Sequence, residues 1–234
     1  MVELKDIEKL FVDGIMKYIY SQREGGIHVT TLVYGCPRYV SWAEEYGNAL
    51  AQANIDNWDG GDWIFRIWIG QKLHETPLTD MHEVKVHYEY GGKKVVGSVD
   101  EIWKTGNDVI VIDKKFVKEL PREMYEHHRK QVQIYSALLR ENGIVTPNKI
   151  ALVYFRPMMS ANNPDERFRV FVEDITPADM DNTIEWIKDM IDRAKRMEKR
   201  ESFFCKFCPY ADMCKEFEEG NIDVEFTGVK KNGR

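Results

Sequence analysis

Residues 97–115 read GSVDEIWKTGNDVIVIDKK and contain the patterns of two β-strands separated by a short polar turn. In the second strand, positions 109–112 are all apolar, which is typical of a strand that is covered on both faces. This strand ends in Asp113, Lys114 and Lys115. Because side chains alternate along a strand, we expect Asp113 and Lys115 on one face and Lys114 on the other. The sequence therefore predicts a carboxylate beside an ammonium at the end of a buried strand.

Two interpretations fit this Asp-x-Lys pair. The first is a buried salt bridge with a structural role only, and the pair taken alone favours it. The second is a metal site, because burying an acid costs several kcal/mol unless a partner such as a metal ion compensates the charge. Asp100, on the preceding strand, would supply a second carboxylate. Features elsewhere in the chain are needed to distinguish the salt bridge from the metal site.

Strand and helix patterns cover most of the sequence. Strand patterns occupy residues 84–90, 93–103, 109–117, 149–155 and 167–174. Helical patterns occupy residues 3–23, 63–75, 121–143 and 176 to about 200. The first three strands follow one another through tight turns at Gly91-Gly92 and at 105–108, which predicts an antiparallel meander. Pro121 and Thr176-Pro177 are expected to begin the last two helices.

Two helices carry polar side chains at informative positions. In the helix that Asp62 can cap, His74 continues the stripe of Trp63 and Ile67, so the histidine is expected to face inward. A hydrogen-bonded core histidine is the commoner explanation of such a residue. In the helix after Pro121, Gln131 and Tyr135 are one turn apart and share a face.

The four cysteines form a complete set. Cys205, Cys208 and Cys214 have C-x2-C-x5-C spacing, and Cys36 is the only other cysteine. Ordinary buried thiols have no reason to cluster in this way. In a reducing compartment, such cysteines are ligands more often than disulfides. An iron–sulfur cluster and a structural zinc ion both accept four thiolates, and the spacing does not separate them.

Composition excludes some classes of protein. The 234 residues are 43% hydrophobic and 31% charged, as in globular proteins. No apolar run approaches the roughly 20 residues that cross a bilayer, and the charged start MVELKDIEKLF is unlike a signal peptide, so a cytoplasmic location without membrane contact is expected. A net charge of −6 argues against coating nucleic acid through bulk positive charge, although a local basic groove would be enough.

Taken together, Gly70-x3-His74, the segment 97–100, Asp113-x-Lys115 and Gln131-x3-Tyr135 have the order and approximate spacing of the motifs of RecB-type nucleases. These nucleases belong to the PD-(D/E)XK superfamily. One cysteine before the motifs and three after them resemble the iron–sulfur branch of that group, which includes the AddB nuclease domain and the CRISPR-associated RecB-like exonucleases. The chain length is most similar to the last of these. One departure is Asp113, where many relatives carry glutamate.

The resemblance implies an α/β fold with a restriction-endonuclease-like core, in which a mixed central sheet is flanked by helices. It implies Mn²⁺ or Mg²⁺ as a cofactor, held by His74, Asp100, Asp113 and the backbone carbonyl of Lys114. Lys115 would orient the attacking water, and Gln131 and Tyr135 would position DNA, unless they only form hydrogen bonds on the helix surface. The four cysteines would hold a [4Fe–4S] cluster that clamps the N- and C-terminal regions together, with [2Fe–2S] or zinc as alternatives.

The expected organisation is one nuclease domain over residues 1–234, with an N-terminal helical region (1–61), a core (62–175) and a C-terminal helix with the cysteine-rich segment (176–234). The expected activity is metal-dependent exonucleolytic hydrolysis of single-stranded DNA. The resemblance implies a role in CRISPR spacer acquisition, with the adaptation integrase complex as a partner. It is also compatible with an oligomer of this chain. The alternatives are a nuclease of DNA repair, a viral counterpart, and a non-catalytic iron–sulfur subunit that binds DNA. An iron or redox sensor would leave the acidic motif unexplained.

Overall fold

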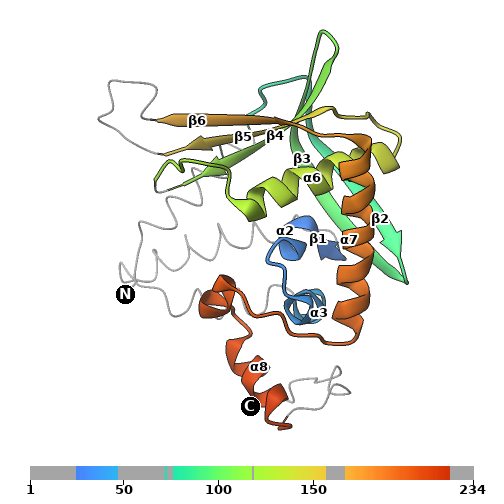
Figure 1. Cartoon of the computed structure of the whole chain (residues 1–234), viewed down its shortest axis with the longest axis vertical. Helices are drawn as coiled ribbons and strands as arrows, with labels where there is room; N and C mark the ends of the chain where they lie inside the picture. Colours follow the sequence, from blue (N-terminus) through green and yellow to red (C-terminus); the bar gives the residue numbers. More distant parts are fainter. Residues whose placement is uncertain (1–24, 47–71, 73–75, 118, 157–166, 222–234) are drawn as a thin grey trace, which may run out of the picture.

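The computed structural model describes residues 25–46, 72, 76–117, 119–156 and 167–221. A mixed six-stranded sheet forms its centre (Figure 1). The strands are β1 (Ile27–His28), β2 (Met81–Tyr90), β3 (Lys93–Thr105), β4 (Asp108–Phe116), β5 (Lys149–Phe155) and β6 (Phe168–Asp174). The β1–β3 and β4–β5 pairs are parallel and the other pairs are antiparallel, so the expected mixed sheet is confirmed.

The predicted meander is confirmed in β2, β3 and β4. Gly91 and Gly92 form the first turn with φ of 56° and 77°, a backbone conformation that glycine adopts without strain. β2 pairs with β3 from Met81 opposite Ile102 to Tyr90 opposite Lys93. The other edge of β3 is shared, because β1 pairs at Val95 and Val96 whereas β4 pairs from Glu101 to Thr105. Residues 97–100 therefore lie where β4 diverges from β3.

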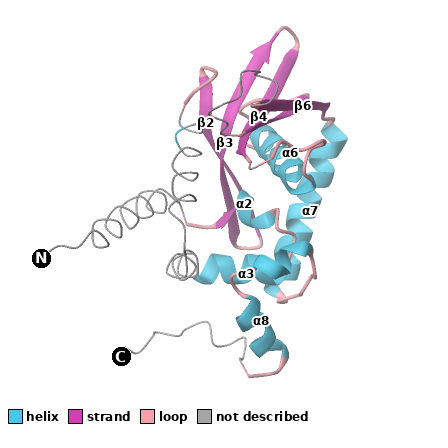
Figure 2. Cartoon of the chain, turned by 90° about the vertical axis from the view of Figure 1, so that its left-hand side faces the viewer, coloured by secondary structure: helices cyan, strands magenta, loops and turns pink. Residues whose placement is uncertain are grey.

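Two long helices cover one face of the sheet: α6 (Glu126–Glu141) and α7 (Pro177–Lys195) (Figure 2). Their apolar sides meet the strands in one core, which includes Val111, Leu138 and Ile187, each fully buried. The predicted start of α7 is confirmed, since Thr176 and Asp179 cap each other reciprocally and Pro177 occupies the first turn.

Two helix boundaries differ from the prediction. α6 begins at Glu126, five residues after Pro121, because Tyr125 is extended (ψ 133°) and the backbone of this segment bonds elsewhere. The Tyr125 amide donates to the Tyr154 hydroxyl at 3.1 Å, and the Pro121 carbonyl accepts from Arg169 at 3.0 Å. α7 ends at Lys195 rather than near Arg200, because Met197 adopts a φ of 55° and its carbonyl accepts a hydrogen bond from Arg38 at 3.0 Å.

A second, smaller core joins the early and late parts of the chain. α2 (Val29–Leu32) and α3 (Pro37–Tyr46) come before the meander, and the 3-10 helix η2 (Phe203–Phe207) and α8 (Ala211–Glu218) come after α7. The second core is supplied by α3, by α8 and by residues between α7 and α8. Its buried members are Trp42, Met197 and Tyr210, with Cys208 and Cys214 packed against them.

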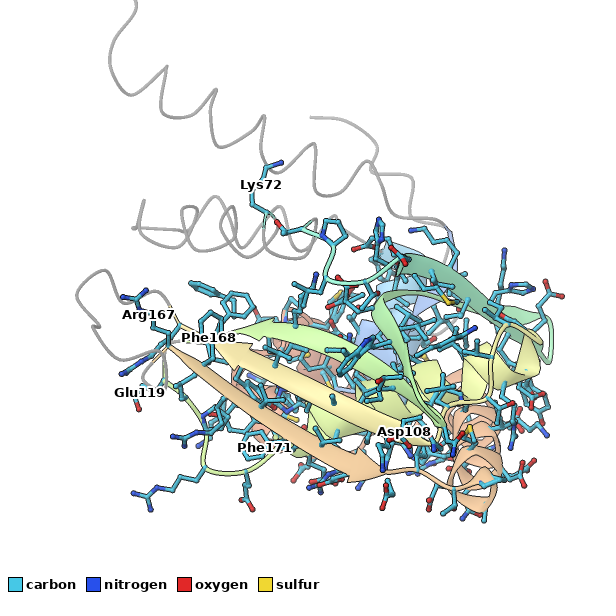
Figure 3. The ribbon with its side chains drawn as sticks, turned by 90° about the horizontal axis from the view of Figure 1, so that it is seen from above. Lys72, Asp108, Glu119, Arg167, Phe168 and Phe171 are labelled. Atoms are coloured by element: carbon cyan, nitrogen blue, oxygen red, sulfur yellow. The ribbon has the colours of Figure 1, made fainter. Side chains whose placement is uncertain are left out.

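The helices predicted at 3–23 and 63–75 lie outside the described residues, apart from Lys72. Among the described residues, no helix is long and apolar enough to cross a membrane. β6 forms one edge of the sheet, with Arg167 and Phe168 at its start, while Asp108 lies toward the opposite end of the strands (Figure 3).

Candidate active site

Two acids face each other where β3 and β4 diverge. Glu101 pairs with Ile112, and continuing this antiparallel register by one residue sets Asp100 opposite Asp113. Side chains at opposed positions of such a pair have Cβ atoms about 4.5–5.5 Å apart. Asp100 is 7% exposed and Asp113 only 1%. The strands therefore hold two buried carboxylates side by side.

Lys115 joins the acids on this face of β4, as the alternation of side chains predicts. Its Nζ lies 2.6 Å from Asp113 Oδ2, and its side chain is 16% exposed, so the residue is not fully buried. Asp100 Oδ2 accepts a hydrogen bond of 2.8 Å from the backbone amide of Lys114. This carboxylate thereby takes a donor from β4 at the position where the β3–β4 ladder stops.

Gln131 and Tyr135 extend the site from α6. The Gln131 amide donates to Asp113 Oδ1 at 3.2 Å and to the Tyr135 hydroxyl at 3.0 Å. Both side chains are 4% exposed, so hydrogen bonding on the helix surface does not describe them. Burial raises the pKa of Tyr135, and the charges of Asp113 and Asp100 raise it further, so the phenol stays protonated. One turn of α6 thus fixes the orientation of an acid on β4.

Gly97 allows the close packing of Tyr135 against β3. A Cβ atom at this position would lie 2.8 Å from Tyr135 Cε1 and 3.0 Å from Val29 Cγ2, which are distances that real contacts do not tolerate without movement. Gly97, the glycine of the motif, is therefore explained by the Tyr135 ring, which packs directly against β3 at this position.

The opposite face of the same strands holds an ion pair that the sequence reasoning missed. Lys114 Nζ lies 2.8 Å from Glu101 Oε1, and both side chains are buried, at 4% and 0% exposure. Glu101 also accepts from the amides of Leu78 and Thr79, at 2.9 and 3.0 Å. The signal was present in the sequence, because Asp100-Glu101 and Asp113-Lys114 place a second acid and a second lysine on the alternate face.

His74, the third predicted metal ligand, lies outside the described residues. The chain just beyond it is held firmly, because Lys114 Nζ donates to the Thr76 carbonyl at 2.9 Å.

The donors present fit a hard divalent cation. Carboxylate oxygens are the preferred ligands of Mg²⁺ and Mn²⁺, and Asp100 and Asp113 present them from opposed strand positions. Within the described residues, no group of three or more histidine, cysteine or acidic side chains is arranged to hold a metal ion. The proposed set needs His74 as well, and the backbone carbonyl of Lys114 lies next to Asp113 on β4.

Two histidines that the sequence analysis did not assign flank Lys115. Burial lowers the pKa of His128 to about 2, with the charges of Lys115 and His127 adding to the effect. Burial followed by Lys115 also lowers the pKa of His127. His128 Nδ1 lies 3.0 Å from the Tyr154 hydroxyl. Both rings are therefore neutral at physiological pH and do not add positive charge to the site.

All four cysteines are free thiols, and Cys208 and Cys214 pack against the second core. Burial raises the pKa of Cys208, and electrostatic interactions with Cys36, Cys205 and Cys214 raise it further. Two N–H groups point at sulfur: Arg38 donates to Cys214 Sγ at 3.1 Å, and the Ser202 amide to Cys205 Sγ at 3.4 Å. Such bonds stabilise thiolate ligands.

Arg38 is a residue that the sequence reasoning did not single out. It is 7% exposed, its guanidinium lies 3.2 Å from Glu218 Oε1, and it packs 4.8 Å above the centre of the Phe217 ring. Together with its bonds to Met197 and Cys214, these contacts attach α3 to α8 without a metal. A single arginine after a cysteine gives no sequence signal for such a role.

Comparison with known proteins identifies one family. The model of the PD-(D/E)XK nuclease superfamily matches residues 34–215. The solved structure of SSO0001 is 25% identical with a TM-score of 0.62, and the match covers 89% of this chain and 96% of that one.

Two further structures are more distant. A putative exonuclease from Eubacterium rectale is 12% identical with a TM-score of 0.37, and the match covers 83% and 79% of the two chains. LHK-Exo in complex with dAMP is 11% identical with a TM-score of 0.40, and the match covers 92% and 100%. These two scores are too low to support an argument. No curated protein matches this chain.

Proposed function

Because this chain belongs to the PD-(D/E)XK nuclease superfamily, we propose that it is a metal-dependent exonuclease that hydrolyses single-stranded DNA. One observation carries the proposal: Asp100 lies opposite Asp113 in the strand register, and Lys115 Nζ lies 2.6 Å from Asp113. Two acids can hold a divalent cation and a lysine can stabilise the charge that develops on the phosphoryl oxygens, which are functions that metal-dependent hydrolysis of a phosphodiester uses.

Asp100, Asp113 and His74 would hold Mn²⁺ or Mg²⁺, which supplies Lewis-acid stabilisation of the charge that builds on the phosphoryl oxygens. The Lys115 ammonium donates hydrogen bonds to the attacking water or to a phosphoryl oxygen. Gln131 keeps Asp113 in one orientation through its hydrogen bond to Oδ1. Tyr135, protonated and buried, keeps Gln131 in place.

The cysteines support a narrower proposal, in which the four thiolates hold a [4Fe–4S] cluster. The spacing of the cysteines in the sequence, the electrostatic interaction of Cys208 with the other three, and the N–H groups directed at Cys214 and Cys205 support this proposal. With this cluster, the chain would belong to the CRISPR-associated RecB-like branch of the superfamily. It would then process DNA ends before integration during spacer acquisition, in contact with the integrase complex.

The activity is tested with end-labelled oligonucleotides and anaerobically prepared protein. In Mn²⁺, linear single-stranded DNA should be degraded to short products, while a circular single strand and a blunt duplex should persist. Asp113→Asn should lose at least about 100-fold in rate, since it removes a charged group from the site. The matched control is Asp108→Asn, an exposed acid at the other end of β4.

Two results would count against the proposal. Failure of cluster-loaded wild-type protein to hydrolyse any DNA or RNA in Mn²⁺ would favour the non-catalytic binding subunit. Cleavage of circular and linear strands at equal rates would leave a nuclease but reject the exonuclease assignment.

A further inference from the structure

Four aromatic rings form a continuous series from the cysteine region to the acidic site. The Tyr34 and Phe204 ring centroids are 4.9 Å apart, those of Phe204 and His127 are 5.3 Å apart, and those of His127 and Tyr125 are 5.8 Å apart. We call these four residues the aromatic track. They come from the α2–α3 loop, from η2 and from the beginning of α6, and the contact between Phe204 and His127 joins the last two.

The rings of the track remain accessible, unlike those of a core. Tyr34 and Tyr125 are 39% and 41% exposed, and Phe204 and His127 are half-buried. In the adjacent small core, Trp42 and Tyr210 are 7% and 2% exposed. A contiguous apolar surface that stays in water is commonly a binding site.

The track passes the catalytic lysine at His127. This residue lies one helical turn before Gln131, whose amide donates to Asp113, and Asp113 is the ion-pair partner of Lys115. The positive charge of Lys115 attracts a phosphate to this part of the track, where the His127 and Tyr125 rings are stacked with an interplanar angle of 10°. A positive group beside exposed aromatic rings is the combination that binds the backbone and bases of an unpaired strand.

We propose that the aromatic track binds the bases of single-stranded DNA by stacking and leads the strand to Lys115. This inference rests on the proposed nuclease function and assigns substrate contacts to four residues outside its catalytic set. Unpaired strands are the substrate class selected, because bases within a duplex are already stacked on their neighbours and present no free face. The competing explanation is that the rings only attach η2 to α6.

Binding of fluorescein-labelled oligo-dT, measured by anisotropy in EDTA so that no hydrolysis occurs, separates these explanations. Tyr125→Ala and Tyr34→Ala should each weaken binding by about 5- to 150-fold, the range expected for loss of one stacked base. Tyr125→Phe, which keeps the ring, should stay within about twofold of wild type. Trp103→Ala is the matched control, because Trp103 is 49% exposed but belongs to the face of β3 opposite Asp100.

An oligonucleotide with abasic sites tests whether bases are the groups bound. Wild type should bind the abasic strand more weakly than oligo-dT, whereas Tyr125→Ala should show a smaller difference. If both tyrosine variants bind oligo-dT as wild type does and only their melting temperatures fall, the track is structural and the inference is wrong. An inactive wild type rejects the proposed function, whereas an active wild type with unaffected tyrosine variants rejects the track alone.

Discussion

Asp113 and Lys115 form an ion pair that a purely structural role and a catalytic role explain differently. If the pair is structural, removing either partner leaves a buried charge and should cost about 3–5 kcal/mol. If the pair is catalytic, Lys115→Ala should abolish cleavage and leave the affinity for Mn²⁺ unchanged or higher, because a positive charge near the cation is lost. Asp113→Asn should abolish cleavage and weaken Mn²⁺ binding, because a charged ligand is lost.

Calorimetric titration with Mn²⁺ and thermal melting of both variants distinguish these roles. With Mn²⁺ present we expect both proteins to melt near wild type, since the cation compensates the Asp113 charge in Lys115→Ala and Gln131 can still donate to an asparagine oxygen at position 113. Melting far below wild type for both, together with no Mn²⁺ binding by wild type, would make the pair a structural salt bridge and remove the basis for the nuclease mechanism.

Gly97 gives a second prediction for a single residue. Gly97→Ala should lower the free energy of unfolding by about 1–3 kcal/mol, because the new methyl group would overlap Tyr135 and Val29. Urea denaturation measures the effect, and Val29→Ala in the same chain should restore part of the loss. Gly25→Ala is the control, since its Cβ would meet no atom within 4 Å. Equal stability of Gly97→Ala and wild type would show that Tyr135 does not require a glycine here.

At this scale the sequence predicted the face of each site residue but not every partner. Strand alternation placed Asp113 with Lys115 and turned Lys114 away, and the ion pairs agree with both assignments. Alternation alone could not show that Lys114 contacts Glu101. That contact depends on which residues of β3 and β4 are paired, and this register is seen only in the structure. The roles of His74, Gln131 and Tyr135 in catalysis stay predictions.

At the scale of elements, the buried Glu101–Lys114 pair attaches residues 76–79 to the sheet. Burial raises the pKa of Glu101, but hydrogen bonds from Lys114, Leu78 and Thr79 outweigh it, and the net pKa lies below its ordinary value. The ionised form therefore stabilises the fold above the unfolded pKa of about 4.3, and this stabilisation is lost as pH falls through the lower folded pKa.

Glu101→Gln should consequently reduce the free energy of unfolding at pH 7 by about 3–5 kcal/mol, because Lys114 is left buried without its carboxylate. The difference from wild type should shrink as urea denaturation is repeated at pH values below 4. Glu173→Gln removes an acid from an exposed pair with Arg129 and should cost no more than about 1 kcal/mol. A Glu101→Gln deficit that is small or independent of pH would contradict the anchoring role.

The strands and helices were predicted well where their signals are local. The Thr176–Asp179 cap and the Gly91-Gly92 turn are such signals, and the structure confirms them. The start of α6 was wrong because the segment after Pro121 satisfies its backbone groups with Tyr154 and Arg169, on strands β5 and β6. These partners lie 29 and 48 positions away, so no local pattern indicates them.

At the scale of the whole molecule, the second core ties the two ends of the described chain together. Arg38 and Cys36 precede the sheet, whereas Tyr210, Cys214 and Glu218 follow it. Contacts between these residues close a loop of more than 150 residues. A closure that persists on unfolding lowers the entropy of the unfolded chain. The sequence analysis expected these regions to be joined by a four-cysteine cluster, and that clamp stays a prediction. The polar contacts of Arg38 and the packing of Trp42 on Tyr210, which join them in the structure, could not be foreseen.

The proposed cluster makes this closure depend on metal. Protein purified without oxygen should be brown, with broad absorbance near about 400 nm from thiolate-to-iron charge transfer. Cys208→Ala should lose this absorbance and melt at lower temperature, because a four-thiolate site without one ligand no longer joins the ends of the loop. Lys206→Ala, an exposed change between two of the cysteines, should keep both the colour and the melting temperature.

The order in which stability and exonuclease activity are lost distinguishes a structural cluster from a catalytic one. If the cluster is a clamp, Cys208→Ala should retain exonuclease activity at temperatures below its lowered melting transition, since the acids and Lys115 belong to the other core. If wild-type protein is colourless and contains one equivalent of zinc, the four cysteines hold a structural zinc ion instead of a cluster, and the proposed clamp is unchanged. Wild-type stability in Cys208→Ala would instead show that Arg38 and the aromatic packing hold the ends together by themselves, because the remaining contacts of the second core involve no metal.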